Sequence, residues 1–428
     1  MNRALSGCSQ AYCRAGNGND RRHEIEDHGS PQETQIPSGI APRLYYIDWL
    51  RVLAILGVFL FHATNVFNTM PWHIKNAEQS VVITTIQAFF FPWGMPLFFM
   101  IAGAGTWFAL KRRTSSQYIK ERSSRLLIPF VVGSIILSPI QLYFEWSHKV
   151  ETGIFAGSFT QFVGSLPWGP NPRIFGVMGY HLWFLGFLFM FSLLALPFFQ
   201  WVRKGAGQRL ISWLAQVCRH RGGILVFTLP PLFIRLGLQP FFPYEHDWAD
   251  FFFLLSFFVI GYLVIGDERL RQAVRRDWPI TLTVGTLAFI GAAIISFSTG
   301  ELDIEGAPHS LVDFAWWGLF AVCGWCWAAF TLFMGMRFLN FSNRLLRYGQ
   351  EAIVPFFVVH QPVIIVIAYF VVQLNAALIP KLLIVVIGSL VVSLALYQLV
   401  IRRVGVLRVA FGMKRSSRDR IPSKATVS

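Results

Sequence analysis

Long apolar stretches recur along the whole chain, and they restrict its fold more than any other feature. Most contain 18 or more residues with few charges, and a helix crosses the core of a bilayer with about 20 apolar residues. A single water-soluble core cannot bury so many runs of this length. The sequence therefore predicts an all-α, polytopic membrane helical bundle with about ten transmembrane helices, at 44–66, 82–110, 126–146, 181–202, 223–237, 250–266, 279–297, 314–335, 352–373 and 381–401.

The distribution of charge predicts how these helices are oriented. Charged residues make up 14% of the chain, against about 25% in soluble domains. With the N-terminus inside, 31 of the 37 Lys and Arg residues fall in the two tails and the inner loops, and five fall in outer segments. This positive-inside pattern predicts two cytoplasmic termini and a multi-pass protein of the plasma (inner) membrane. It accounts for the net charge of +15, so we expect no nucleic-acid partner.

Composition divides the chain into three parts. Residues 1–43 are polar, with mixed charges and no apolar signal-peptide core, and we expect a disordered cytoplasmic tail. Residues 44–402 form the predicted membrane domain, and 403–428 a basic cytoplasmic tail. No segment between the helices is long enough for a second domain.

The first predicted helix carries Asp48, Arg51 and His62 on one face. Arg51 and His62 are eleven positions apart, which is three helical turns with about 20° of drift and a rise of roughly 16 Å. Ionisable residues within membrane helices are costly and mark functional sites. We interpret His62 as a general base, and Arg51, with Asp48 beside it, as a site for a phosphate or carbonyl group. The alternatives for Arg51 are snorkelling to the headgroups or a structural ion pair with Asp48.

The loop before the third predicted helix is strongly basic. Arg122 and Arg125 are spaced i, i+3 and would share a helix face. Such a pair is suited to clamp a phosphorylated cytoplasmic ligand. Ordinary positive-inside bias, or contact with anionic lipids, explains the same charges without a ligand.

Polar residues also gather at the predicted outer ends of the third and fourth helices. Glu145 lies at the end of the third, and His181 and Trp183 at the start of the fourth. A Trp face and orienting polar groups fit a carbohydrate subsite, so these are candidate substrate-binding residues. An interfacial aromatic belt with polar companions is the alternative.

His360 is the last candidate substrate-binding residue, and it lies between Pro355 and Pro362 in the ninth predicted helix. Prolines free backbone carbonyls in membrane helices, and His360 either satisfies these carbonyls or lines a cavity. The sequence contains no P-loop, no zinc-ligand spacing and no nucleophile elbow. We therefore predict neither a metal site nor a permanently bound cofactor.

At these residues the chain resembles the acyltransferase 3 family of integral membrane acyltransferases. The family signature in the first helix is a basic residue, ten residues and then His, as in Arg51 and His62. The ending of the last matching segment is similar to that of a glucan-modifying branch. The resemblance covers about residues 44–402, and four further segments match in the family's order: 95–103, 122–129, 181–185 and 359–362.

The resemblance implies an O-acyltransferase that moves an acetyl- or succinyl-like group from cytoplasmic acyl-CoA to a carbohydrate or polyol hydroxyl at the outer face. Acyl-CoA would then be a co-substrate, with its phosphates near Arg122 and Arg125. Arg51 would serve the donor and His62 the acceptor. A transporter that uses Arg51 and His62 as a relay or gating pair is the alternative. The sequence makes no prediction of oligomeric state.

Overall fold

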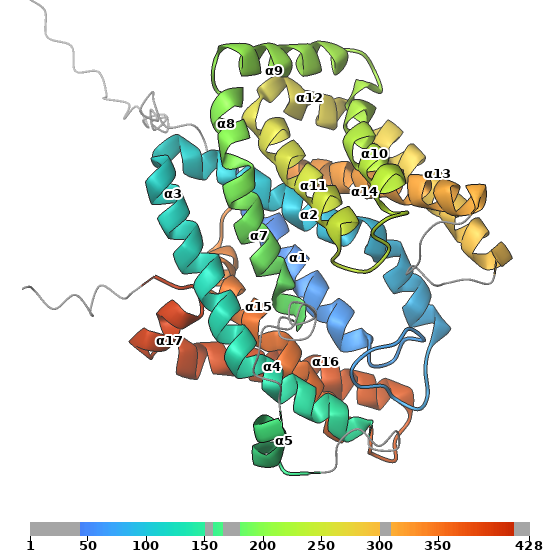
Figure 1. Cartoon of the computed structure of the whole chain (residues 1–428), viewed down its shortest axis with the longest axis vertical. Coiled ribbons are helices and arrows are strands. Elements are labelled where there is room, and N and C mark those ends of the chain that lie inside the picture. The colour runs from blue at the N-terminus through green and yellow to red at the C-terminus, as the bar shows by residue number, and fades with distance from the viewer. Residues whose placement is uncertain (1–42, 150–156, 166–179, 300–309, 415–428) are drawn as a thin grey trace, which may run out of the picture. The chain divides into compact units, whose positions relative to one another are not determined.

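The computed structural model describes residues 43–149, 157–165, 180–299 and 310–414, and within these ranges every regular element is a helix (Figure 1). The predicted all-α fold is thus confirmed for the described residues. The predicted tail 1–43 lies outside them except for its last residue. The predicted tail 403–428 is described only to residue 414 and includes the short helix α17 (Gly405–Ala410).

The described residues contain fewer span-length helices than the ten ranges predicted. A ninth span is formed only if two helices that meet at 45°, 180–194 and 196–202, are counted together. The described residues contain eight helical stretches that are long and apolar enough to cross a membrane: α1 (Tyr45–Thr64), α2 (Val81–Arg112), α3 (Ser115–Arg122) continued by η1 (Ser123–Leu127) and α4 (Ile128–His148), α11 (Trp248–Gly266), α13 (Trp278–Thr299), α14 (Leu311–Phe338), α15 (Arg344–Val371), and α16 (Leu378–Ala395) continued by η5 (Leu396–Ile401).

Prolines explain why two of the predicted spans, 181–202 and 223–237, are not single long helices. The bent pair consists of η3 (Tyr180–Leu182) and α7 (Trp183–Leu194), followed by α8 (Leu196–Val202), which has Pro197 in its first turn. The predicted span 223–237 is η4 (Gly223–Thr228) followed by α10 (Leu229–Leu238), which begins with Pro230 and Pro231. Proline has no backbone N–H, so it starts a helix more readily than it continues one. Eight or nine helices of the described residues are thus long and apolar enough to span a membrane, against about ten predicted.

Side-chain caps define where several long helices begin. Ser80 accepts a hydrogen bond from the backbone of α2, and Asn343 does so for α15. Ser310 forms a capping box at α14, as Thr114 does at α3. Each cap satisfies backbone N–H groups that lack a partner in the first turn. Shorter helices connect the long ones: α5 (Phe159–Ser165), α9 (Gly205–Val217) and α12 (Glu268–Arg276).

A close crossing joins α2 to α11 through Gly103 and Gly261. A Cβ at Gly103 would lie 1.9 Å from the carbonyl oxygen of Phe258, and one at Gly261 would lie 2.0 Å from that of Met100. Small residues allow membrane helices to approach this closely. Helix α1 contacts α2, α14, α15 and α16 (Figure 1), so its side chains face several elements that are distant in sequence.

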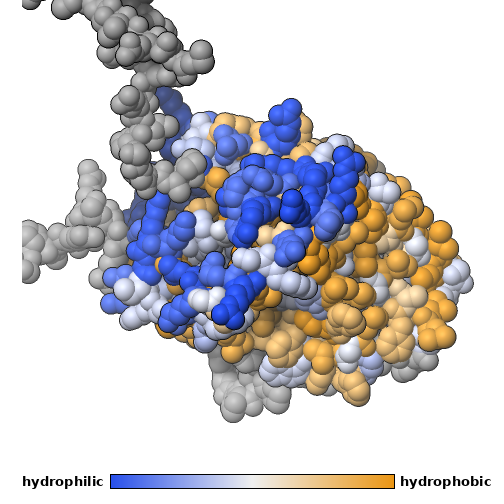
Figure 2. Space-filling model, turned by 90° about the horizontal axis from the view of Figure 1, so that it is seen from above, coloured by the Kyte–Doolittle hydropathy of each residue, from blue (hydrophilic) through white to orange (hydrophobic). Residues whose placement is uncertain are grey.

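The surface of the bundle is divided by polarity. Figure 2 looks onto the end that carries α9 and α12 in Figure 1, and it shows hydrophilic residues gathered there beside a hydrophobic flank. Large apolar side chains remain exposed along α13 and α16, including Ile294, Phe297, Ile387 and Val391. An exposed apolar flank of this kind is suited to contact with lipid chains.

Candidate functional site

The line of ionisable residues predicted on α1 is present in one unbroken helix. Arg51 Nη1 lies 3.4 Å from Asp48 Oδ1. A Cβ at Gly105 of α2 would lie only 3.0 Å from Arg51 Nη2, so the glycine leaves room for the guanidinium. Since α1 is continuous from Tyr45 to Thr64, the rise of roughly 16 Å between the backbones of Arg51 and His62 holds. These two side chains occupy separate ends of the site.

Arg122 reaches the same turn of α2 as Arg51. Its Nη2 donates a hydrogen bond of 3.2 Å to Thr106 Oγ1, and its guanidinium lies over the Tyr118 ring. Its Nε is buried and has no hydrogen-bond partner among the described residues. Two guanidinium groups therefore approach neighbouring residues of α2, and one of them retains an unmatched donor.

Arg125 is engaged elsewhere. Its Nε lies 3.5 Å from Glu121 Oε1, and the other carboxylate oxygen of Glu121 pairs with Arg113. The residues between Arg122 and α4 form the π-helical stretch η1, which has more residues per turn than an α-helix. The i, i+3 spacing consequently does not lead Arg122 and Arg125 to the same partners.

His62 and His360 form a hydrogen-bonded pair. His62 Nδ1 lies 3.0 Å from His360 Nε2, although 298 positions separate them in the chain. The ring planes differ by 4° and the ring centroids are 5.3 Å apart. Because the two nitrogens account for most of that separation, the rings meet edge to edge in one plane, which is good geometry for an N–H···N bond. His360 is fully buried in α15, whereas His62 is partly exposed.

His181 completes a cluster of three imidazoles. Its ring centroid lies 4.9 Å from that of His360 and 6.3 Å from that of His62. His181 Nε2 donates to the backbone oxygens of Phe357, at 2.9 Å, and Val358, at 3.2 Å. Pro362 has no N–H to bond the carbonyl four residues earlier, which is that of Val358. The proline therefore leaves the carbonyl oxygen of Val358 free to accept a hydrogen bond from His181.

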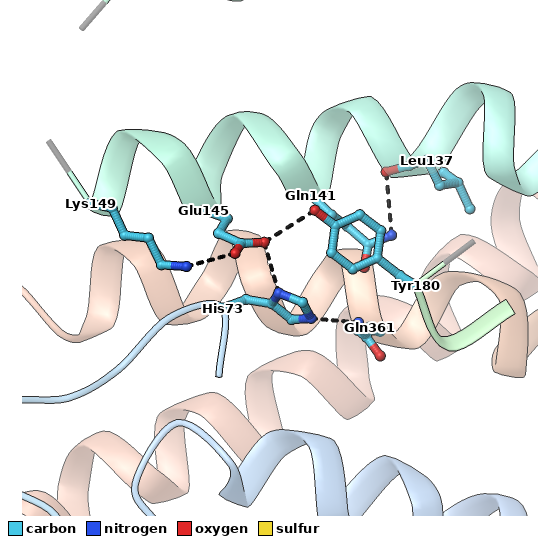
Figure 3. A network of polar contacts seen from close by, with 7 residues as sticks. All are labelled: His73, Leu137, Gln141, Glu145, Lys149, Tyr180 and Gln361. Atoms are coloured by element: carbon cyan, nitrogen blue, oxygen red, sulfur yellow. Dashed lines mark hydrogen bonds and ion pairs between the residues drawn. The ribbon is translucent and has the colours of Figure 1, made fainter. Parts of the chain in front are cut away.

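A second polar cluster surrounds Glu145 (Figure 3). One carboxylate oxygen accepts from His73 Nδ1 at 2.7 Å and from the Tyr180 hydroxyl at 3.1 Å, and the other accepts from Lys149 at 2.8 Å. The far nitrogen of His73 lies 3.4 Å from the amide nitrogen of Gln361. Gln361 directly follows His360 on α15, so neighbouring residues of one helix belong to the two clusters.

The segment that carries His73 is held by the partly buried ammonium group of Lys75. Lys75 Nζ donates to the backbone oxygens of Asn65 and Asn68 and to the side-chain oxygen of Asn68. Asn68 is in turn bonded to Gln87 of α2. Burial lowers the pKa of Lys75 from its usual 10.5 to about 8. The loop between α1 and α2 is thereby tied down where it presents His73.

Trp183 has different neighbours. Its ring packs on His246, with centroids 4.1 Å apart, and the backbone N–H of His246 donates to Asp250. Asp250 also accepts from the buried Arg235, at 2.6 Å. The contact with His246 thus leads to the α10–α11 connection, and the ring contacts of Trp183 in the described part of the chain include neither His62 nor His181.

Four residues of these clusters were not among the predicted site residues: His73, Lys149, Tyr180 and Gln361. Tyr180 directly precedes His181, and its positive backbone φ of 40° is a conformation that favours glycine. His73 lies in a short loop without periodicity, and its partner Glu145 is 72 residues away. The only sequence signal was the presence of a His and a Tyr beside predicted outer helix ends.

Comparison with known proteins agrees with the geometry. The acyltransferase 3 family, described as an acyltransferase domain, matches residues 44–398. Glucans biosynthesis protein C of Salmonella typhimurium is 24% identical over 404 residues, covering 89% of this chain and 98% of that protein. The protein of the same name from Salmonella heidelberg is 24% identical over 393 residues, covering 87% and 96%. No solved structure matches the chain. The predicted resemblance is confirmed, and the chain belongs to the acyltransferase 3 family of membrane acyltransferases.

Proposed function

We propose that this protein transfers an acyl group from a cytoplasmic thioester, acyl-CoA, to a hydroxyl group of a carbohydrate at the outer face of the plasma (inner) membrane. The single observation that carries the proposal is the line along α1, with Arg51 at one end and His62, inside a cluster of imidazoles, at the other. The positive-inside distribution of Lys and Arg supports the assignment of the Arg51 end to the cytoplasm.

The donor end is supported by the contacts of Arg51 and Arg122 with one turn of α2. Arg122 has a buried Nε donor without a partner, and guanidinium groups bind phosphate oxygens well. An extended thioester arm would bridge the distance from these groups to His62. In this arrangement Arg51 holds the donor and does not contact the acyl carbon together with His62.

The acceptor end is supported by the Glu145 cluster, which lies next to the imidazole cluster along α15. Carboxylate, imidazole, phenol and amide groups are suited to orient several hydroxyl groups. The names of the related proteins refer to glucans, which favours a glucan acceptor.

The chemistry requires one proton acceptor. His62 takes the proton of the acceptor hydroxyl as its oxygen attacks the thioester carbonyl carbon. The C–O bond forms, the C–S bond breaks, and the thiolate leaves with the proton held by His62. A proton-transferring group of this kind contributes about 10²- to 10⁴-fold to the rate.

The test is acyl transfer from labelled acyl-CoA to glucan oligosaccharides by purified protein in liposomes. We expect His62→Ala to lower kcat by about 10²- to 10⁴-fold and Arg51→Ala to raise the KM for the donor. His220→Ala and Arg209→Ala, at exposed positions, are matched controls that should retain activity. Full activity in a folded His62→Ala protein would contradict the role of His62. Movement of substrate across the membrane without acylation would favour the transporter.

A further inference from the structure

The hydrogen bonds of His360 determine where the protons of the imidazole cluster lie. His360 Nδ1 is 2.6 Å from the backbone oxygen of Phe357. A carbonyl oxygen only accepts, so His360 Nδ1 carries a hydrogen and donates it. The position of one proton is thus set by a backbone group that does not titrate.

The partner nitrogen of His360 follows from its burial. The side chain is fully buried, and no carboxylate contacts it among the described residues. A charged imidazolium without a counter-ion is costly in such a place, so the ring is neutral and Nε2 has a lone pair. His360 Nε2 therefore accepts the hydrogen bond of 3.0 Å, and His62 Nδ1 donates it.

The same reasoning assigns the free nitrogen of His62. A neutral imidazole carries one N–H, and in His62 this is on Nδ1, so Nε2 has a lone pair. His62 Nε2 has no hydrogen-bond partner among the described residues, and the side chain is partly exposed. The lone pair is therefore available to a hydroxyl group that enters the site.

We propose that His360 is a positioning residue, which fixes the tautomer and the plane of His62 so that Nε2 is the atom that accepts the proton of the acceptor hydroxyl. This inference rests on the proposed acyl transfer. When Nε2 takes the proton, His62 becomes an imidazolium and its Nδ1–H···Nε2 bond to His360 becomes charge-assisted and stronger. When Nε2 returns the proton to the departing thiolate, the starting arrangement is restored.

His181 also bonds the carbonyl group that orients His360. Its Nε2–H donates to the Phe357 oxygen that also accepts from His360, and to the oxygen of Val358 left without its helical partner by Pro362. Its buried Nδ1 has no partner among the described residues. The carbonyl that orients His360 is thus held from both sides.

Two variants of His360 with similar side-chain volume separate positioning from packing. In His360→Gln the amide oxygen can accept from His62 Nδ1–H near the place of the lost Nε2, whereas His360→Leu offers no acceptor. We expect His360→Leu to lower kcat by about 10- to 100-fold, as other groups that orient a functional imidazole do, with little change in either KM. His360→Gln should retain most of kcat. Equal losses in the two variants, or no loss in His360→Leu, would overturn the proposal.

A spectroscopic readout tests the tautomers directly in the unmodified protein. In ¹⁵N-histidine-labelled protein at neutral pH, protonated and unprotonated ring nitrogens have well-separated chemical shifts. We expect the hydrogen on Nδ1 in His62 and His360 and on Nε2 in His181, with His62→Gln and His360→Gln used for assignment. A hydrogen on Nε2 of neutral His62 would overturn the proposal. This measurement needs no turnover, so it separates failure of the positioning role of His360 from failure of the proposed acyl transfer.

Discussion

Adding a side chain at Gly105 tests the role of Arg51 without changing Arg51 itself. A Cβ at this position would lie 3.0 Å from Arg51 Nη2, and no other atom of a neighbouring element lies within 4 Å. Gly105 is only partly buried, and a Cβ there meets no backbone atom of another element within 4 Å. The substitution therefore acts on the guanidinium.

The expected effect depends on the size of the added group. Ordinary contacts begin at 3.4 Å, so Gly105→Ala requires the flexible guanidinium to retreat by about 0.4 Å. Gly105→Leu places further carbon atoms where the guanidinium lies and displaces it by about 1 Å or more, a misplacement that can cost on the order of 100-fold in rate. We expect Gly105→Ala to change kcat/KM for the acyl donor little, and Gly105→Leu to lower it by about 100-fold.

The assay is the initial rate of acyl transfer in liposomes, with the donor varied at saturating acceptor and then the reverse. Gly94→Leu is the matched control, since it lies in the same helix and nothing lies within 4 Å of its Cβ. The double variant with Arg51→Ala should be no worse than Arg51→Ala alone, because both changes remove one interaction.

Two results would refute this reasoning. Wild-type kcat/KM for the donor in Gly105→Leu, together with a large loss in Arg51→Ala, would show that the position of the guanidinium beside α2 is unimportant. Additive losses in the double variant would show that Gly105 acts through another group.

Three further predictions follow from packing, charge and burial. Gly103→Ala should destabilise the fold by about 1–3 kcal/mol or more, because its Cβ would meet the Phe258 oxygen at 1.9 Å. Thermal unfolding in detergent measures this loss, with Gly57→Ala as the control because Gly57 has open space around it. A Tm of Gly103→Ala equal to that of Gly57→Ala would contradict the prediction. Glu145→Gln should raise the KM for the acceptor about tenfold or more, as for loss of a charge-assisted hydrogen bond worth about 1.5–3 kcal/mol, and leave the KM for the donor unchanged; the reverse pattern in steady-state kinetics would place Glu145 in the donor site. At Lys75 the folded-state pKa of about 8 lies below the usual 10.5, so the folded protein binds fewer protons than the unfolded chain between these values, and its unfolding free energy rises with pH. The Tm of the wild type minus that of Lys75→Met should increase across this window, and a constant or falling difference would argue against the lowered pKa.

The apolar runs and the first-helix motif made much of this protein predictable. The prediction of membrane-spanning segments requires only length and hydrophobicity, which are local properties of the sequence. The shared face of Asp48, Arg51 and His62 follows from helical periodicity alone. Local proline positions, in contrast, ended or bent two segments that hydropathy had predicted as full spans.

The partners of the site residues were not predictable in the same way. His62 meets His360 across 298 positions, and His73 meets Glu145 across 72. Arg122 and Arg125 share a spacing but contact different groups, because a π-helical turn lies between Arg122 and α4. Each of these contacts depends on the rotation and depth of a helix relative to its neighbours.

From its sequence alone, this chain is determined to be a helical membrane protein with a basic residue and a histidine along its first span. Its tertiary structure alone decides which faces of the helices form the interior. The 18-residue cores of α11 and α13 have the same mean hydropathy, yet 72% of the first and 17% of the second are buried. In lipid the outer surface is as apolar as the interior, so hydrophobicity does not distinguish them. Close contacts between helices set the packing, and the packing of α15 against α1, with Gly349 beside Val52, brings His360 to His62.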